Sequence, residues 1–208
     1  MTQIQQVKEL AALGVDYAGF IFYEKSPRYM VGRIDPKELR NLGQVINKTG
    51  VFVNENYNVI MKTVKEYGLD AVQLHGSETP DFCTRISSSV KTIKVFRITG
   101  NEDLGALIND YPESADYFLF DTKAKEFGGT GRKFSWDILR QASLAKPYFL
   151  SGGIAPGDVA SINGFINNSA TPYPYALDLN SRFEIQAGLK DLPLLKSFIE
   201  DFRREAAK

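Results

Sequence analysis

The strongest constraint on the fold is a regular alternation between short apolar runs and segments with the periodicity of an α-helix. Most of the apolar runs are continuous, which is typical of parallel strands that are covered on both faces. Parallel strands joined by helices form right-handed βαβ units, so the pattern predicts an α/β fold. The predicted strands are residues 17–23, 50–53, 71–75, 92–98, 117–121, 148–152 and 175–180.

The helical segments outnumber the strands. The sequence contains seven predicted strands and eight helical segments, and it opens on a helix in which Thr2 and Gln5 have capping-box spacing. Eight helices around a closed parallel sheet require eight strands, because an open barrel leaves unpaired backbone edges. We therefore predict a (β/α)8 TIM barrel whose first strand is missing from this chain, in one N-terminally truncated domain of residues 1–208. An open, doubly wound sheet is the alternative.

The composition excludes several classes of protein. The 25 basic and 25 acidic residues cancel, so no net charge attracts the chain to nucleic acid or to an anionic membrane. No apolar run approaches the roughly 18 residues of a membrane-spanning helix. The single cysteine cannot form an internal disulfide, and with the single histidine it cannot build a zinc site. We expect a cytoplasmic domain that needs no metal.

In a barrel of this type, functional side chains lie at the C-terminal ends of the strands and on the loops that follow. Asp121 ends the fifth predicted strand after four apolar residues, which directs its carboxyl group toward a low-dielectric mouth where it can act as a general acid. A single carboxylate at such a position is otherwise usually solvated or caps a helix. The other candidates at strand ends are Arg28, Gln73, His75, Gly152, Gly153, Asp178, Asn180 and Ser181.

Two of these candidates carry opposite expectations. Arg28 offers a planar fork that suits a carboxylate or a phosphate, and its neighbours Pro27 and Tyr29 indicate a held side chain rather than an ordinary surface charge. A lone histidine such as His75 is more often a hydrogen-bonded structural residue than a catalyst. The sequence therefore points to Arg28 as a ligand-binding residue and leaves both interpretations of His75 open.

The glycine-rich segments and the cysteine also differ in what they indicate. Gly152 and Gly153 end a buried strand, where they let the backbone approach an anion closely, and the last two loops of such barrels commonly bind phosphate. Residues 128–131 are also glycine-rich, but such loops are frequent on protein surfaces. Cys83 lies in a helical segment of the outer ring, which predicts a packed thiol rather than a nucleophile or base.

Six motifs carry a resemblance to a known family when they are taken in order: GFIFYEKSPRY, GVFVN, GLDAVQLHG, FLFDTKAKEFGGTGRKFSW, FLSGGI and ALDLNSRFE. From residue 2 onward, the chain resembles phosphoribosylanthranilate isomerase of tryptophan biosynthesis. The resemblance implies a (β/α)8 barrel without metal or cofactor. It also implies conversion of N-(5-phosphoribosyl)anthranilate into 1-(2-carboxyphenylamino)-1-deoxyribulose 5-phosphate by an Amadori rearrangement. The implied partner is this small phosphosugar, and the implied assembly is a monomer or homodimer.

The resemblance also implies roles for individual residues. Asp121 matches the general acid that protonates the furanose ring oxygen, so that the ring opens to a Schiff base. Arg28 matches the arginine that holds the anthranilate carboxylate. The implied substrate-binding set also includes Gln73, His75 and Asp178, and the implied phosphate site consists of Gly152, Gly153, Asn180 and Ser181.

Two departures from the family pattern stand out. The family's general base is a cysteine on its first strand, in a segment that reads like K-V-C-G-M-T, and Met1-Thr2 matches the end of that segment. We hypothesise that Met1 corresponds to an internal methionine of a longer protein, and we expect the chain as given to turn over substrate poorly. Arg182 stands where many relatives carry glycine, and it either adds charge to the phosphate site or points outward.

Two other functions are the alternatives. A phosphosugar-binding barrel without catalysis retains the phosphate loops and Arg28 but lacks the base. Another phosphosugar isomerase of the same barrel type, such as a histidine-pathway isomerase, is expected to show a second phosphate site and an internal half-barrel repeat. The sequence contains no such repeat.

Overall fold

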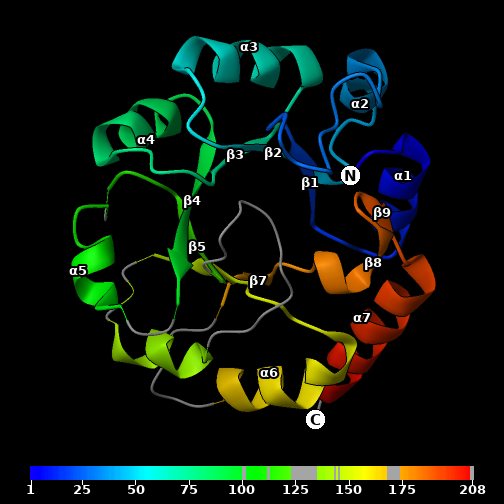
Figure 1. Cartoon of the computed structure of the whole chain (residues 1–208). Helices are drawn as coiled ribbons and strands as arrows, with labels where there is room; N and C mark the ends of the chain where they lie inside the picture. The colour runs from blue at the N-terminus through cyan, green and yellow to red at the C-terminus, as the bar shows by residue number, and fades with distance from the viewer. Residues whose placement is uncertain are drawn as a thin grey trace.

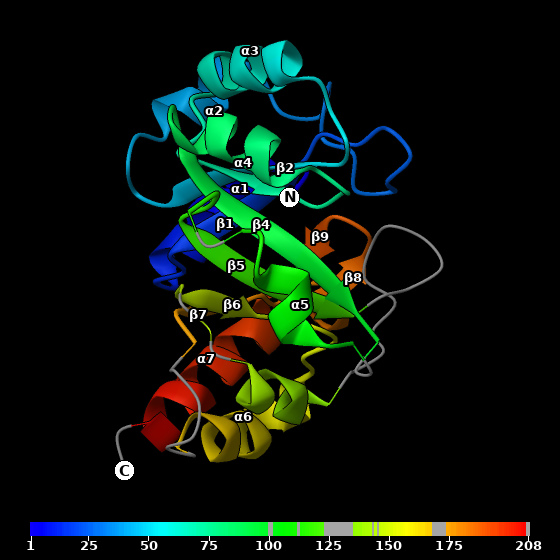
Figure 2. The ribbon, with the colours of Figure 1, turned by 90° about the vertical axis from the view of Figure 1, so that its left-hand side faces the viewer.

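A computed structural model of the chain describes residues 1–99, 102–111, 113–122, 135–142, 144, 146–167 and 174–206. In the view of Figure 1, the helices form an outer ring around the strands, in the order in which they follow one another along the chain. Figure 2 shows the strands running diagonally through the centre of the molecule, with helices above and below them. This is the layout of an α/β barrel.

Seven parallel strands form one sheet, in the order β1-β2-β3-β4-β5-β6-β7. Each strand pairs with its neighbours in sequence, and Phe20 of β1, for example, lies opposite Gly50 of β2. A doubly wound sheet reverses its strand order at a switch point, so the unbroken order contradicts that alternative and confirms the predicted barrel topology. The strands are β1 (Tyr17–Ile21), β2 (Asn47–Phe52), β3 (Ala71–Leu74), β4 (Lys91–Ile98), β5 (Tyr117–Thr122), β6 (Tyr148–Leu150) and β7 (Ala176–Leu177).

Each predicted strand overlaps an observed strand, but β2 begins three residues before the predicted start at residue 50, and the last prediction was too long. The chain leaves the sheet after Leu177, and Asp178 turns its carboxylate to accept a hydrogen bond from Ser151 Oγ at 3.0 Å. The residues predicted as strand over 178–180 therefore form a loop at the end of the barrel.

Eight helical segments, α1–α7 and η1, surround the sheet as predicted, although η1 is a 3-10 helix. Thr79 Oγ1 accepts a hydrogen bond from the N–H of Phe82 at 3.3 Å, and Gly68 ends α3 with φ at 62°. Within the ranges that the structure describes, no helix is long and apolar enough to cross a bilayer. The helices are α1 (Ile4–Ala12), α2 (Pro36–Asn41), α3 (Tyr57–Tyr67), α4 (Pro80–Ser87), α5 (Leu104–Ile108), η1 (Trp136–Gln141), α6 (Val159–Ile166), which follows η2 (Pro156–Asp158), and α7 (Leu192–Ala206).

The first helix does not use the predicted capping box. Helix α1 begins at Ile4, and its N-cap residue Gln3 makes no side-chain capping bond. Thr2 is buried and donates its hydroxyl to the carbonyl of Gly188 at 2.9 Å. The capping-box prediction for Thr2 and Gln5 was wrong because a contact with a distant part of the chain occupies the hydroxyl.

The sheet separates two apolar layers. Phe118 and Phe120 of β5 pack in the outer layer, between the sheet and the helices. Leu119, which lies between them in the sequence, packs with Ile93, Val95 and Phe149 in a second cluster. Alternate residues of one strand are thus buried in different layers, which explains why the strands read as continuous apolar runs.

Strands β1 and β7 are the two edges of the seven-stranded sheet, and among the described residues they do not pair with each other. We call the space between these two strands the seam. Two side-chain contacts bridge it. Beside the N-terminal ends of the strands, the hydroxyls of Tyr17 and Tyr175 lie 3.1 Å apart. Beyond the C-terminal ends, Arg28 forms an ion pair with Glu184 at 2.6 Å.

An antiparallel hairpin, separate from the seven-stranded sheet, lies beside the seam, and the sequence patterns did not predict it. Strands β8 (Glu184–Gln186) and β9 (Leu189–Lys190) follow η3 (Ser181–Phe183). Gln6 of α1 donates its Nε2 to the Lys190 carbonyl at 2.8 Å and accepts from the Lys190 N–H at 3.0 Å. These bonds hold the hairpin against the first helix, on the side of the sheet seen at the right of Figure 2.

The amino group of Met1 lies next to β1, where it donates a hydrogen bond to the carbonyl of Gly19 at 2.7 Å. Burial lowers the pKa of this amino group from 8.0 to about 5, and the positive charge of Lys190 acts in the same direction. The buried amino group is therefore neutral at pH 7, whereas the same group in the unfolded chain is mostly protonated.

In a chain that begins at Met1, the free energy of unfolding is expected to rise as the pH increases from about 5 to 8.0. Over this range the unfolded chain holds a proton that the folded chain has lost, so each pH unit adds about 1.4 kcal/mol to stability. Urea titrations at several pH values measure the effect, with Met1 confirmed by mass spectrometry. The N-terminally acetylated chain is the control, and an equal pH dependence of the two forms would contradict the prediction.

Candidate active site

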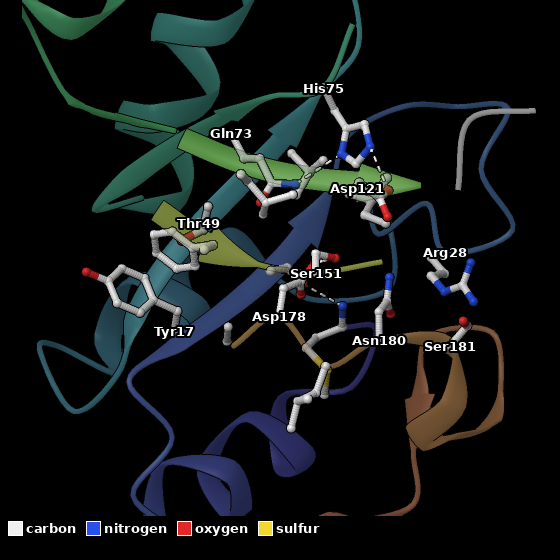
Figure 3. A pocket seen from close by; sticks show the side chains of 18 of the residues that line it. Tyr17, Arg28, Thr49, Gln73, His75, Asp121, Ser151, Asp178, Asn180 and Ser181 are labelled. Carbon is white, nitrogen blue, oxygen red and sulfur yellow. Dashed lines mark hydrogen bonds and ion pairs between the residues drawn. The ribbon is translucent and has the colours of Figure 1, made fainter. Parts of the chain in front are cut away.

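The predicted functional residues converge on one pocket at the C-terminal ends of the strands. The cavity has a volume of about 220 Å³ and continues along the seam, where apolar residues of α1 and α7 line it. Figure 3 shows side chains from several strands pointing into the same space. The predicted residues that line it are Arg28, Gln73, His75, Asp121, Gly153, Asp178, Asn180 and Ser181. Gly152 does not line the cavity and is buried next to Gly153.

Asp121 of β5 contacts His75, which follows β3. His75 Nε2 lies 3.3 Å from Asp121 Oδ2, an ion-pair distance, and Gln73 Nε2 lies 3.1 Å from His75 Nδ1 (Figure 3). An amide nitrogen only donates hydrogen bonds, so with this orientation of the Gln73 amide, Nδ1 accepts and the ring proton lies on Nε2, facing Asp121. Gln73 therefore orients the His75 ring, and the ring lies against the Asp121 carboxyl group at the mouth of the barrel.

A buried ion pair supports the loop that carries His75. The carboxylate of Glu78 accepts from the N–H groups of Gly76 and Asn54 at 3.0 and 2.9 Å and from Lys94 Nζ at 2.7 Å. The side chains of Glu78 and Lys94 are each 3% exposed. The sequence patterns did not identify this pair, although a lysine inside the apolar strand TIKVF is a signal that could have revealed it.

A second carboxylate, that of Asp178, enters the pocket from the end of β7. Ser151 Oγ donates to Asp178 Oδ2 at 3.0 Å, and the N–H of Asp178 donates to the carbonyl of Leu150 at 2.8 Å. Burial raises the pKa of Asp178, and the negative charge of Asp121 raises it further. The two carboxyl groups thus influence each other across one cavity, an arrangement that suits transfer of protons to and from a single substrate.

Arg28 is held at the rim of the pocket by a residue that the sequence patterns did not identify. Its Nε donates to both carboxylate oxygens of Glu184, at 2.9 and 3.1 Å, and its Nη2 donates to Oε2 at 2.6 Å. Lys190 Nζ lies 3.4 Å from the same carboxylate. Burial alone raises the pKa of Glu184, but the hydrogen bonds from Arg28 and the charge of Lys190 hold this pKa below its ordinary value.

Two glycines of the predicted phosphate site adopt a left-handed backbone conformation. Gly152 and Gly153 follow β6 in the left-handed region, with φ at 91° and 76°, where glycine meets no steric penalty. Glycine at these positions lets a ligand approach the backbone closely. Asn180 and Ser181 line the cavity from the neighbouring loop, whereas Arg182 is exposed and does not line it.

The other two sequence-based predictions lie away from this pocket. Cys83 is buried in α4 in the outer ring, and burial raises the pKa of its thiol to about 11. The prediction of a packed thiol is therefore confirmed. The glycine-rich segment 128–131 and most of the predicted loop 122–133 lie outside the described residues.

The comparisons with known proteins place this site in a family. A family model described as N-(5'phosphoribosyl)anthranilate (PRA) isomerase matches residues 1–201. The chain belongs to this family. The PRA isomerase of Parabacteroides distasonis is 38% identical over 210 residues, covering 100% of this chain and 93% of the relative. That of Phocaeicola vulgatus is 34% identical and covers 99% and 96%.

Solved PRA isomerase structures share the fold. The enzyme from Thermus thermophilus superimposes with a TM-score of 0.83 at 25% identity, covering 99% of this chain and 96% of that one. The Thermotoga maritima enzyme gives 0.83 at 32% identity, with 98% and 96% covered. A PRA isomerase in complex with reduced 1-(o-carboxyphenylamino)-1-deoxyribulose 5-phosphate gives 0.78 at 29% identity, with 98% and 95% covered. The fold and the family predicted from the sequence motifs are confirmed.

Proposed function

We propose that this chain catalyses the isomerisation of N-(5'-phosphoribosyl)anthranilate to 1-(2-carboxyphenylamino)-1-deoxyribulose 5-phosphate, a step of tryptophan biosynthesis. The observation that carries the proposal is one cavity into which two carboxyl groups, Asp121 and Asp178, project beside an arginine and a glycine-lined loop. Membership of the PRA isomerase family and a relative that binds the reduced product support the same substrate.

Asp121 is the proposed general acid. It gives its proton to the furanose ring oxygen, the bond from that oxygen to C1 breaks, and the lone pair of the anthranilate nitrogen forms the C=N bond of the Schiff base. His75 Nε2, 3.3 Å from Asp121 Oδ2, is placed to hold the carboxyl group in position, and the emptied carboxylate takes up a new proton from solvent. Asp121 and His75 thus lie at the ends of β5 and β3, which are separated in the sheet by β4.

The second half of the reaction removes the proton at C2 and gives the enolamine, which tautomerises to the ketone. The resemblance to the family assigns this step to a thiol, but Cys83 lies in the outer ring with its pKa raised by burial. The negative charge of Asp121 raises the pKa of Asp178, so these two carboxyl groups interact across the cavity. Because Cys83 is the single cysteine of the sequence and does not line the pocket, slow turnover of the chain as given stays a prediction.

Two anion subsites account for the remaining polar residues. Arg28 is proposed to bind the anthranilate carboxylate, because guanidinium pairs with carboxylate through two parallel hydrogen bonds. Gly152, Gly153, Asn180 and Ser181 are proposed to bind the phosphate through backbone N–H groups. Gln73 contributes by orienting His75. The reaction needs protons and anion recognition from these residues and no cofactor.

The test is a direct assay of the isomerase. Phosphoribosylanthranilate is fluorescent, so its enzyme-dependent decay reports turnover, and growth of a tryptophan auxotroph that lacks the isomerase checks the result. Binding of the reduced product without turnover or growth would favour the non-catalytic phosphosugar-binding barrel. Turnover of the histidine-pathway aminoaldose instead of phosphoribosylanthranilate would favour the other phosphosugar isomerase.

Assembly and location stay predictions. A dimeric PRA isomerase is known from Thermotoga maritima, and we propose that this chain is a monomer or homodimer. The balanced charge of the sequence supports the proposal that it acts in the cytoplasm on a small phosphosugar.

A further inference from the structure

Three charged side chains meet at the rim of the pocket, and we call Arg28, Glu184 and Lys190 the rim cluster. All three side chains line the cavity and are largely buried, with exposed fractions of 11%, 3% and 10%. Buried charges are costly unless they are paired and hydrogen-bonded. Because these buried charges line the ligand pocket, we consider what they contribute to ligand binding.

Glu184 occupies one edge of the Arg28 fork. The bonds from Nε and Nη2 fix the guanidinium plane, and the N–H of Gly188 donates to Glu184 Oε1 at 3.1 Å, which fixes the carboxylate in turn. In the part of the chain that the structure describes, no bond is made by Nη1 of Arg28. The edge of the fork that carries Nη1 is therefore available to a carboxylate of a ligand, and its direction is set by Glu184.

Lys190 connects the same carboxylate to the loop after β7. Its Nζ lies 3.4 Å from Glu184 Oε1 and donates to Asn180 Oδ1 at 2.9 Å and to the carbonyls of Leu179 and Asn180, both at 3.2 Å. Figure 3 shows Arg28, Asn180 and Ser181 grouped at one side of the pocket. One hydrogen-bonded network thus extends from the guanidinium to the loop proposed to bind phosphate.

The charges of the rim cluster do not cancel. Arg28 and Lys190 carry two positive charges, and Glu184 carries one negative charge. The excess favours an anion at the rim, and the shared carboxylate offsets part of the repulsion between Arg28 and Lys190. Glu184 is therefore placed where a change in its charge or length alters the positions of both cations.

We propose that Glu184 and Lys190 are positioning residues that align the carboxylate subsite at Arg28 with the phosphate subsite at Asn180 and Ser181, so that the enzyme selects ligands carrying both anions. This inference rests on the proposed function and names the residues that set its specificity. Glu184 acts through Arg28 and does not itself touch the substrate.

The test compares two probes by isothermal titration calorimetry. Reduced 1-(o-carboxyphenylamino)-1-deoxyribulose 5-phosphate carries both anions, and ribose 5-phosphate carries the phosphate alone. In Glu184→Gln, the affinity for the first probe is expected to fall about 10–100-fold, the effect of losing a well-oriented bond between charged groups. The affinity for ribose 5-phosphate is expected to change less than about 3-fold, which is under 1 kcal/mol.

Steady-state kinetics separate positioning from a general loss of folded enzyme. Misaligned binding raises KM with little change in kcat, whereas partial unfolding lowers the apparent kcat and leaves KM unchanged. Glu200→Gln, which removes a negative charge from an exposed position on α7, is the matched control and should behave as the unsubstituted chain. Arg28→Lys keeps the charge but loses the fork, so it tests the same subsite if Glu184→Gln does not fold.

The outcomes distinguish this inference from the proposed function. If the unsubstituted chain binds the two-anion probe no more tightly than ribose 5-phosphate, the carboxylate subsite of the proposed function is wrong. If it binds that probe more tightly and Glu184→Gln keeps the full advantage, the positioning role is overturned and the proposed function stands. The double variant that combines Glu184→Gln with Arg28→Lys gives a further check. If Glu184 acts through Arg28, this double variant should bind the two-anion probe no more weakly than the weaker-binding of the two single variants.

Discussion

Replacement of Asp121 by asparagine is expected to lower kcat by about 10²–10⁴-fold, the usual contribution of a general acid. Asparagine has nearly the shape of aspartate, but its amide group cannot give a proton to the ring oxygen. The substitution does not alter the proposed carboxylate subsite at Arg28, so KM should vary little. The decay of phosphoribosylanthranilate fluorescence, measured against the unsubstituted chain, gives the effect.

The matched control for this variant lies at the other end of the same strand. Asp116 precedes β5 and accepts hydrogen bonds from Lys91 Nζ at 2.9 Å and from the N–H of Thr92 at 2.8 Å, away from the pocket. Asp116→Asn should leave kcat unchanged, because residues at the N-terminal face of a barrel contribute to stability rather than to catalysis. If kcat of Asp121→Asn lies within about 10-fold of kcat of the unsubstituted chain, the proposed role of Asp121 as general acid is wrong.

Replacement of Lys94 by methionine is expected to lower the free energy of unfolding by about 3–5 kcal/mol, the usual result of removing one partner of a buried ion pair. The variant leaves the carboxylate of Glu78, 3% exposed, without its cation. The N–H groups of Gly76 and Asn54 still donate to that carboxylate, but they carry no full positive charge to balance it. Urea titration at pH 7 measures the loss.

Two further variants isolate the cause of that loss. The double variant Lys94→Met with Glu78→Gln removes both charges, so it should be more stable than Lys94→Met alone. Lys91→Met, on the same strand but with a side chain 66% exposed, should leave stability nearly unchanged. A double variant that is less stable than Lys94→Met would show that the buried charge is not the source of the effect.

The strands could be predicted because both faces of the sheet are buried, as Leu119 and Phe120 illustrate on successive positions of β5. The hairpin that carries Glu184 and Lys190 could not, because its strands are short and partly exposed and show no clear periodicity. The end of β7 was misjudged for a related reason. The side chain of Asp178 bonds to Ser151, and no local pattern records that contact.

The site residues were predicted more completely than their interactions. Asp121 was identified because a carboxylate at the end of an apolar strand must reach the mouth of the barrel. Its pairing with His75 depends on the direction of two side chains on strands that are not adjacent, β3 and β5. The partner of Arg28 lies 156 positions away in the sequence, and spacing alone carries no information about such a pair.

Backbone hydrogen bonds connect each pair of neighbouring strands from β1 to β7, but within the described residues none connects β1 and β7 across the seam. A substrate bound as proposed, to Arg28 on one side of the seam and to Ser181 on the other, would connect the two edges. Part of the binding free energy would then hold the β1 and β7 edges together, and the ligand-bound enzyme would be more stable against unfolding than the free enzyme. The contacts that bind the substrate at the C-terminal ends of the strands would then also stabilise the barrel at the seam.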